Sequence, residues 1–275
     1  MARKEGGMNI AFIGAGAMAR AISAGASKAD PNEWSFAFYD PAPGAADQAA
    51  KGCSGTAMPT AETAMEGADL VVLAVKPQVQ AAVIAGLPKT DACIVSIAAG
   101  RTTADITAEL LAAGWASPAV VRVMPNVNAM VGRATSAICW NDVASRAQVS
   151  AVTSLFGAIG ETMEIPEPLF GAFTAMAGSS PAWFFRIVNA LALAGVAAGL
   201  TKQQASLAAA SAMAGSGELL VRTLHDGGHP ETLVDQVCSP GGTTIAGLLA
   251  AEDAGLSAAL DAAVDATILR DSELG

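Results

Sequence analysis

The chain has 275 residues, of which 52% are hydrophobic and 15% charged, and its formal net charge is −10. This composition excludes a disordered chain and leaves room for one large domain or two modest ones. An acidic chain without a basic run is poorly suited to binding nucleic acid. The four cysteines, Cys53, Cys93, Cys139 and Cys238, lie far apart, so we expect reduced core thiols in a cytoplasmic protein.

The N-terminus carries no recognisable export signal. Residues 1–7, MARKEGG, are polar and are not followed by the apolar h-region of a signal peptide, so we expect a disordered leader. The most membrane-like stretch runs from Ile187 to Leu200, but it is mostly alanine and too short to span a bilayer, and Lys202 closes it. We therefore expect a buried helix there and no membrane partner.

From residue 8 to about 165, short β-rich runs alternate with helix-like segments, which is the pattern of a mostly parallel sheet. Several runs are apolar throughout, as strands covered on both faces must be. The expected strands are MNIAFI (8–13), WSFAFY (34–39), DLVVLAV (69–75), ACIVSIA (92–98), VVRVMP (120–125), TSAICW (135–140) and ETMEI (161–165). The expected helices between them include residues 17–28, 102–112 and 142–157.

After residue 166 no further β-rich run follows, and the pattern becomes helical. We expect Pro181 in the first turn of one helix and Thr201 as the cap of the next. The expected helices run from about 181 to 199, from 202 to 224, from 243 to 252 and from 256 to 270. Residues 8–166 and 167–275 are therefore predicted to form two domains, the second one all-α.

A glycine loop, IGAGAMARAISAG (13–25), follows the first expected strand and opens a helix. Gly14 and Gly16 allow a tight turn and a close approach to a pyrophosphate, and Ala19 supplies the third small position. The helix N-terminus, beginning at Ala17 and Met18, then presents free N–H groups to the phosphates. A tight turn without a ligand is the alternative, but the place of the loop in an alternating α/β region favours a Rossmann-type dinucleotide-binding domain.

Asp40 follows the second expected strand, 26 residues after Gly14. A carboxylate there can bind the ribose 2′-hydroxyl of NAD and repel the 2′-phosphate of NADP. Asp40 can equally cap the turn DPAPG (40–44). Both interpretations stay open at this point.

Further segments, taken together with the glycine loop, resemble those of a known family. They are VVLAVKPQ (71–78), SIAAG (96–100), RVMPNVNAMVG (122–132) and SPGGTT (239–244), supported by AMAGSSPAWFF (175–185), HPETL (229–233) and ILRDSEL (268–274). In this order they resemble the pyrroline-5-carboxylate reductases, which close proline biosynthesis. The chain departs from the usual family pattern at Asn128, Ala177, Ser180, Trp183 and Gly227.

The resemblance implies NAD(P)H-dependent reduction of L-1-pyrroline-5-carboxylate to L-proline, with dual use of NADPH and NADH. The cofactor is expected at the carboxyl ends of the parallel strands. The expected cofactor-binding residues are Gly14, Gly16, Ala17, Met18, Asp40, Ala74, Val75, Lys76, Pro77, Ala98, Ala99, Gly100, Met124, Pro125 and Asn126. For Lys76, an ordinary surface lysine at a strand end is the alternative.

The SPGGTT segment is suited to holding a carboxylate. Its two glycines let the backbone turn several N–H groups toward one point, and a helix N-terminus adds partial positive charge. A tight turn with a threonine N-cap is the alternative. The resemblance favours a substrate carboxylate and places Thr244 near the ring nitrogen as the catalytic candidate. The expected substrate-binding residues are Val237, Ser239, Gly241, Gly242, Thr243 and Thr244.

Metal and partner expectations are simple. His225 and His229 have the spacing of some zinc ligands, but the residues between them break the helix, so we expect no metal. The resemblance implies a homodimer through the helical domain, with dimers gathering into larger rings. Two rival functions remain, namely a reductase of another cyclic imino acid of the piperideine-carboxylate type and a non-catalytic NAD(P)-binding regulator.

Overall fold

The computed structural model describes residues 7–274, so residues 1–6 of the expected leader lie outside the described residues. The chain divides into two compact units, one of which is Ser180–Ala266. The division at Ser180 lies beyond the expected domain limit at 166/167, because the first turns of the helical half are fastened to the sheet. The expected domain limits themselves stay a prediction.

The first unit is an α/β fold built on a single sheet. Its strand order is β3-β2-β1-β4-β5-β6-β7-β8. Strands β1 to β6 pair in parallel, β7 is antiparallel to β6, and β8 is parallel to β7. The strands are β1 (Met8–Ile13), β2 (Trp34–Tyr39), β3 (Thr56–Ala57), β4 (Leu70–Leu73), β5 (Cys93–Ser96), β6 (Val120–Met124), β7 (Ala134–Trp140) and β8 (Gly160–Glu164).

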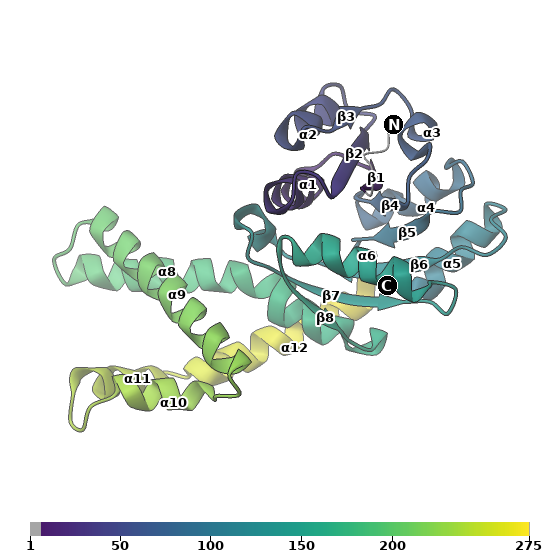
Figure 1. Ribbon diagram of the computed structural model, residues 1–275. Helices are drawn as coiled ribbons and strands as arrows, with labels where there is room; N and C mark the ends of the chain where they lie inside the picture. Colours follow the sequence, from purple (N-terminus) through teal and green to yellow (C-terminus); the bar gives the residue numbers. More distant parts are fainter. Residues whose placement is uncertain (1–6, 275) are drawn as a thin grey trace. The chain divides into compact units, whose positions relative to one another are not determined.

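Helices cover both faces of the sheet (Figure 1). One face packs against α1 (Ala17–Ala29), α2 (Ala45–Cys53) and α6 (Arg146–Gly157). The other packs against α3 (Ala61–Met65), α4 (Pro77–Ala85) and α5 (Thr103–Ala112). All four residues of β4 are buried as a result, which explains why its sequence is apolar throughout.

All seven expected strands are present, with ends that differ by at most two residues. The sequence analysis missed β3, which pairs with Ala37 and Phe38 at the edge of the sheet. A strand of two residues is too short to show an alternating pattern. The four cysteines are free thiols; three are buried, and burial raises the pKa of Cys93 and Cys139 to about 12. Cys238 is half-buried in the helical unit, so the expectation of a core thiol was wrong there.

The helical unit contains α8 (Ser180–Ala197), α9 (Lys202–His225), α10 (Pro230–Val237), α11 (Thr243–Asp253) and most of α12 (Leu256–Leu274). Helices α8 and α9 pack against each other, and a Cβ on Gly195 would lie 3.0 Å from that of Ala205. Thr201 caps α9 as expected, since its side chain accepts a hydrogen bond from the Gln204 N–H.

Pro181 lies in the first turn of α8, as we expected, but α8 continues an earlier helical run. One helical run extends from Glu167 to Ala197 through η2 (Glu167–Leu169), α7 (Phe170–Phe173), the π-helical η3 (Thr174–Ser179) and α8. A proline inside an α-helix lacks the N–H for one hydrogen bond and clashes with the preceding turn. The wider π-helical turn immediately before Pro181 allows the helical run to continue through it.

This run of 31 residues contains an 18-residue window with a mean hydropathy of 1.3, and it is long and apolar enough to cross a membrane by length and composition alone. Our length argument, made on residues 187–200, was therefore wrong. Only 17% of its apolar window is buried within the chain, so the expected buried helix is mostly exposed in a single copy. One such helix is weak evidence for a membrane, because helices of soluble proteins pass the same test.

The start of the run is anchored on the sheet. Arg122 of β6 is buried, and its Nη1 donates to Oε1 of Glu167 at 3.1 Å while its guanidinium lies over the Phe170 ring. Thr103 donates its N–H and its hydroxyl to the same carboxylate at 2.8 and 2.7 Å. Burial by itself would raise the pKa of Glu167, but these hydrogen bonds outweigh it and hold the pKa below its ordinary value.

Candidate functional site

The residues expected to bind the cofactor gather at the carboxyl ends of the parallel strands, which we call the cofactor edge of the sheet. The register pairs Ile13 with Tyr39 and with Leu73, and it pairs Leu73 with Ser96. The segments that follow these parallel strands therefore leave the sheet on the same side. Strands β1 and β4 are direct neighbours, so the strand order reverses between them, and ligands of open α/β sheets bind at such a switch point.

Gly14 is required at this point by its conformation and by its neighbour. Its φ is +99°, and a Cβ there would lie 2.5 Å from the carbonyl oxygen of Ala74. A side chain would be strained and would collide with the backbone of the segment that follows β4. The glycine loop and the AVKP segment are consequently held against each other.

The N-terminus of α1 is open. Its N-cap is Gly16, and no described side chain caps its first turn. A Cβ on Gly16 would meet no described atom within 4 Å, so the space beside the N-cap is open. Ala19 is fully buried, in agreement with its expected role as the small residue where helix and strand touch. This arrangement suits a pyrophosphate group.

Asp40 is fixed beside the glycine loop. Its Oδ2 accepts from the Ala15 N–H at 2.8 Å, and its Oδ1 accepts from the Ala42 N–H at 2.8 Å. The second bond is the turn cap that we considered as the alternative role, and the first braces the glycine loop. Both oxygens keep a further lone pair, so a bond to a ribose hydroxyl stays a prediction. Arg20 lies nearby and donates to the Ala15 carbonyl at 3.2 Å.

The segments after β4 and β5 line the same edge. Lys76 is exposed and its backbone caps α4, where Pro77 is the first residue. After β5, Ala98 is buried and Gly100 has a φ of +69°. Small residues at this edge leave room for a flat ring, but contact with the cofactor stays a prediction for each of them.

Asn126 differs from the other expected cofactor residues because its side chain is already engaged. It is 5% exposed, and its Nδ2 donates to the carbonyl of Ala177 at 3.0 Å. Its Oδ1 accepts from the N–H groups of Asn128 and Thr135, both at 3.3 Å. Sequence reasoning placed Asn126 at the correct edge but could not find these partners.

The SPGGTT segment joins α10 to α11. Gly241 has a φ of +68°, which favours glycine, whereas Gly242 has a φ of −80°. A Cβ on Gly242 would lie 2.3 Å from the Ser239 hydroxyl oxygen, which can rotate away, and 3.1 Å from the Ser239 carbonyl oxygen, so the turn is tight at this position. The N-cap of α11 is Gly242, and Thr243 and Thr244 are its first two residues. The alternative of a threonine N-cap is therefore wrong, and the first turn has no side-chain cap from its N-cap residue.

The histidines have local roles. His229 is the N-cap of α10, where its Nδ1 accepts from the Glu231 N–H at 3.2 Å. Within residues 7–274 as described, no group of three or more His, Cys, Asp or Glu side chains is placed to hold a metal ion.

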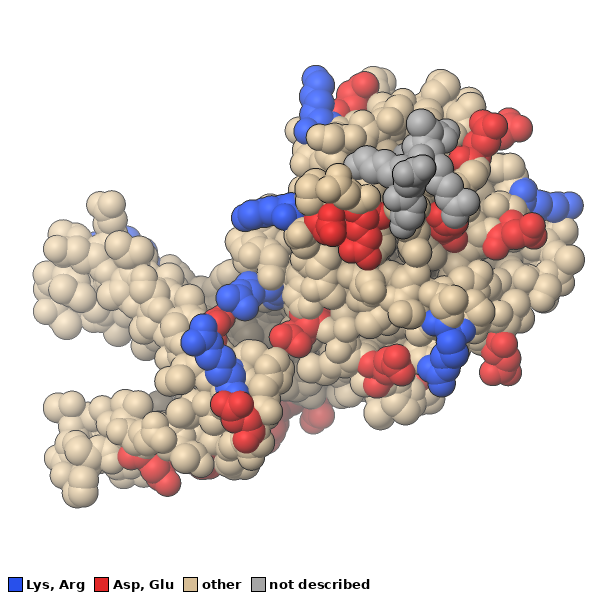
Figure 2. Space-filling model, in the orientation of Figure 1, with Lys and Arg blue, Asp and Glu red and all other residues tan. Residues whose placement is uncertain are grey.

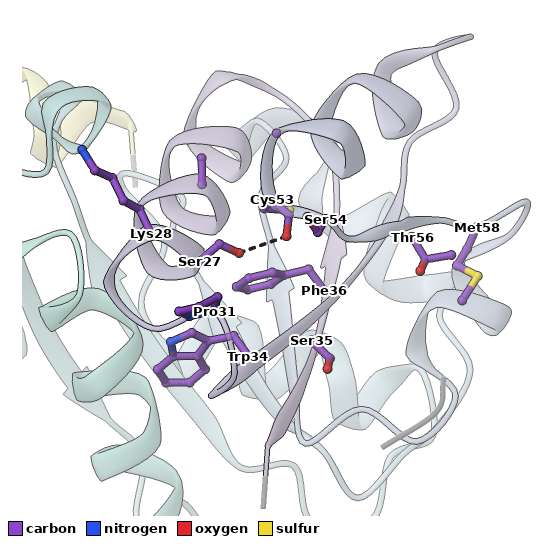
Figure 3. A pocket seen from close by; sticks show the side chains of 12 residues that line it. Ser27, Lys28, Pro31, Trp34, Ser35, Phe36, Cys53, Ser54, Thr56 and Met58 are labelled. Atoms are coloured by element: carbon purple, nitrogen blue, oxygen red, sulfur yellow. Dashed lines mark hydrogen bonds between the residues drawn. The ribbon is translucent and has the colours of Figure 1, made fainter. Parts of the chain in front are cut away.

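A hollow of about 720 Å³ lies away from the expected cofactor edge (Figure 3). It borders Trp34 and Ser35 at the start of β2, whereas Asp40 and the glycine loop lie past the other end of that strand. In its wall the Ser27 hydroxyl donates to the Cys53 carbonyl at 3.0 Å. We therefore do not assign this hollow to the nucleotide.

Comparisons with known proteins agree with this arrangement. Residues 9–100 match the family described as NADP oxidoreductase, coenzyme F420-dependent, and residues 167–274 match the family described as pyrroline-5-carboxylate reductase dimerisation. Together with the fold, these matches define an NAD(P)H-dependent oxidoreductase that carries a helical self-association domain.

The pyrroline-5-carboxylate reductase of Methanosarcina acetivorans is 35% identical over 273 residues, which cover 97% of each chain. The crystal structure of the Streptococcus pyogenes enzyme superposes with a TM-score of 0.84 at 30% identity, over 98% of this chain and 99% of that one. The chain belongs to the pyrroline-5-carboxylate reductase family. A Plasmodium falciparum pyrroline carboxylate reductase with NADP bound shares the fold, with a TM-score of 0.80 at 22% identity, over 98% of this chain and 99% of that one.

The family, the Rossmann-type domain followed by a helical one, and the NAD(P)H-dependent reductase class were all expected from the sequence and are confirmed. The individual binding residues stay predictions.

The open N-terminus of α1 can be tested at Gly16 rather than Gly14, since a side chain at Gly14 would disturb the fold itself. We expect Gly16→Val to lower NADPH affinity at least tenfold, because the side chain would occupy the space of the pyrophosphate, while the melting temperature stays within a few degrees. Gly157→Val, at another glycine with open surroundings, is the matched control. Unchanged NADPH affinity in calorimetry would contradict the proposed phosphate site.

Proposed function

We propose that this chain reduces L-1-pyrroline-5-carboxylate to L-proline with NAD(P)H, as the last step of proline biosynthesis. The observation that carries the proposal is the SPGGTT turn in a chain that also has an open nucleotide edge. Gly241 has a left-handed backbone conformation, Gly242 lies close to Ser239, and as the N-cap Gly242 leaves the N-terminus of α11 without a capping side chain. A regulator that only bound a nucleotide would not need this second anion site.

The cofactor supplies the chemistry, and the protein binds and orients it. When bound, the nicotinamide would supply the hydride that reduces the C=N carbon of the substrate. Residues of the glycine loop and the first turn of α1 hold the pyrophosphate. The small residues after β5 let the nicotinamide lie flat, and the segments after β4 and β6 border it. These residues are Gly14, Gly16, Ala17, Met18, Ala74, Val75, Lys76, Pro77, Ala98, Ala99, Gly100, Met124 and Pro125.

The cofactor choice is proposed to be dual. The carboxylate of Asp40 is fixed where the ribose of NADH can meet it, since two backbone N–H groups hold it in place. Arg20, at the same loop, offers a positive charge that can offset the repulsion of a 2′-phosphate by Asp40.

The substrate carboxylate is proposed to bind the SPGGTT turn. N–H groups of the first turn of α11 and the hydroxyls of Ser239 and Thr243 are proposed to donate hydrogen bonds to this carboxylate. The turn is exposed in the described chain, so a ligand can reach it. Thr244 hydrogen-bonds the ring nitrogen and orients the imine. Val237, which is 65% exposed at the end of α10, offers an apolar contact to the ring. No strong acid is needed if the ring nitrogen binds already protonated.

The function is tested by following NADH and NADPH oxidation with the five-membered imine and its six-membered homologue. We expect oxidation of both cofactors only when an imine is added, with the five-membered ring preferred about 10- to 200-fold, since one methylene is worth about 1–3 kcal/mol. A preference for the larger ring would identify a piperideine-carboxylate reductase. Tight NADPH binding without any oxidation would identify a regulator.

The role of Thr244 is tested by Thr244→Val, which keeps the shape and removes the hydroxyl. We expect kcat/KM for the imine to fall roughly 10- to 150-fold, as for the loss of one hydrogen bond to a charged group. NADPH affinity and melting temperature should stay the same, because Thr244 does not cap α11. Thr232→Val, at an exposed threonine of α10, is the matched control and should leave kcat/KM unchanged. A lowered melting temperature with normal kinetics would mean that the turn is only structural.

Self-association of the helical domain is proposed to produce an obligate homodimer, from which larger rings are built. Large apolar side chains are exposed on this unit, among them Phe185, Leu207 and Leu249 at 65%, 67% and 58%. The face shown in Figure 2 is largely uncharged over these helices. Such a surface marks an interface. A second copy that covers this apolar surface would also explain why the run Glu167–Ala197 is apolar without a membrane around it. We accordingly propose a cytoplasmic enzyme.

We expect sedimentation at micromolar concentration to show a dimer or a multiple of it, in the absence of detergent. Leu207→Glu should shift the protein toward monomer, because a charge would have to be buried at the interface. Val143→Glu, at a 45% exposed apolar residue of the sheet unit, should not. A wild-type monomer, or recovery only in the membrane fraction, would contradict the proposal.

A further inference from the structure

The helical run around Pro181 contains a carbonyl group that the helix itself cannot satisfy in the usual way. In an α-helix the N–H of residue 181 donates to the carbonyl of residue 177. Proline has no N–H, so the Ala177 carbonyl lacks that partner. The π-helical turn Thr174–Ser179 lies immediately before this position. Such turns are often found at functional sites.

Asn126 supplies the missing donor from outside the helix. Its Nδ2 lies 3.0 Å from the Ala177 carbonyl oxygen. Its Oδ1 accepts from the backbone N–H of Asn128, at the start of η1 (Val127–Val131), and from that of Thr135 in β7. A single buried amide therefore joins three backbone segments, and each of its bonds is made within the protein.

The π-helical turn also lies directly on the end of β6. A Cβ on Gly178 would be 3.0 Å from the methyl carbon of Met124, so only a small residue fits without a shift of Met124. Met124 is the last residue of β6 and is expected to border the nicotinamide. The stretch AGSSPAW (177–183) begins on this turn, and the family resemblance places it around the substrate ring.

We propose that Asn126 is a positioning residue and not a cofactor ligand. By donating to the carbonyl that Pro181 leaves open, it holds the π-helical turn against the end of β6. It thereby sets the position of residues 177–179 relative to Met124. This inference rests on the proposed function only for its effect on imine turnover, since the hydrogen bonds stand without it.

The proposal predicts which property Asn126 affects. The side chain is already engaged, because one N–H of its Nδ2 donates to Ala177, its Oδ1 accepts from two backbone N–H groups and its exposure is low. Its replacement should consequently leave NADPH affinity unchanged and should impair the reaction of the imine. A cofactor ligand would show the opposite pattern.

The test is a double-variant cycle with Asn126→Asp and Pro181→Ala. Asn126→Asp keeps the shape and the acceptor oxygen but removes the donor and places a carboxylate beside the Ala177 carbonyl. We expect NADPH affinity within twofold of wild type and at least a tenfold fall in kcat/KM for the imine. Pro181→Ala gives residue 181 an N–H that can reach the same carbonyl. In the Pro181→Ala background, Asn126→Asp should lower kcat/KM for the imine only a few-fold, because the Ala177 carbonyl keeps a hydrogen-bond partner.

Two results would overturn the proposal. A tenfold loss of NADPH affinity in Asn126→Asp with an unchanged kcat would make Asn126 a cofactor ligand. Fully additive effects of the two substitutions on kcat/KM would mean that residues 126 and 181 do not act through the same Ala177 carbonyl. Where Asn126→Asp alone is too unstable to purify, recovery of folded protein by Pro181→Ala supports the proposal, and failure to recover it contradicts it.

The melting temperatures of the wild type, the two single variants and the double variant should show the same non-additivity. If the wild type lacks imine-dependent oxidation, the proposed function fails, but the cycle in melting temperature and NADPH affinity still decides the role of Asn126.

Discussion

The nucleotide edge depends on the close approach of two backbones. Gly14 lies so near the Ala74 carbonyl that a Cβ would stand 2.5 Å from its oxygen. This contact joins the ends of β1 and β4, the neighbouring strands at which the sheet order reverses. Helix α1 begins directly after this contact, and its N-cap residue Gly16 has no side chain to cap it. Asp40 fixes the loop by accepting a hydrogen bond from the Ala15 N–H. Open amides at this edge follow from the glycine, because any side chain would force the strand ends apart.

The helical half depends on the sheet for its first turns and on another copy for its surface. Glu167 is fastened by Arg122 and Thr103, and the Ala177 carbonyl is fastened by Asn126. These bonds explain why residues up to 179 belong to the sheet unit, although the pattern turns helical earlier. Beyond them, exposed apolar side chains such as Leu207 leave the chain incomplete as a single copy. The same apolar character gives one helical run the composition of a membrane span.

The SPGGTT turn shows how an anion site can be built without a basic residue. Gly241 provides a left-handed backbone conformation, and Gly242 provides the close approach to Ser239. The N-cap of α11 is a glycine, so the helix start has no capping side chain and carries a partial positive charge. We propose that this turn holds a carboxylate by geometry, without the long-range attraction that a lysine would exert.

The sequence alone determined the alternating α/β pattern followed by a helical one, the glycine loop, seven of the eight strands and the family. These features depend on local periodicity and on short motifs. Tertiary structure alone decided the π-helical turn at Pro181, the three bonds of Asn126 and the close contact at Gly242. Each of these joins residues that are distant in the chain or depends on exact backbone spacing. A proline indicates a helix start by its own chemistry. Only the donor of Asn126, which follows β6 and lies 51 positions away from Ala177, shows how a longer helical run continues through this one.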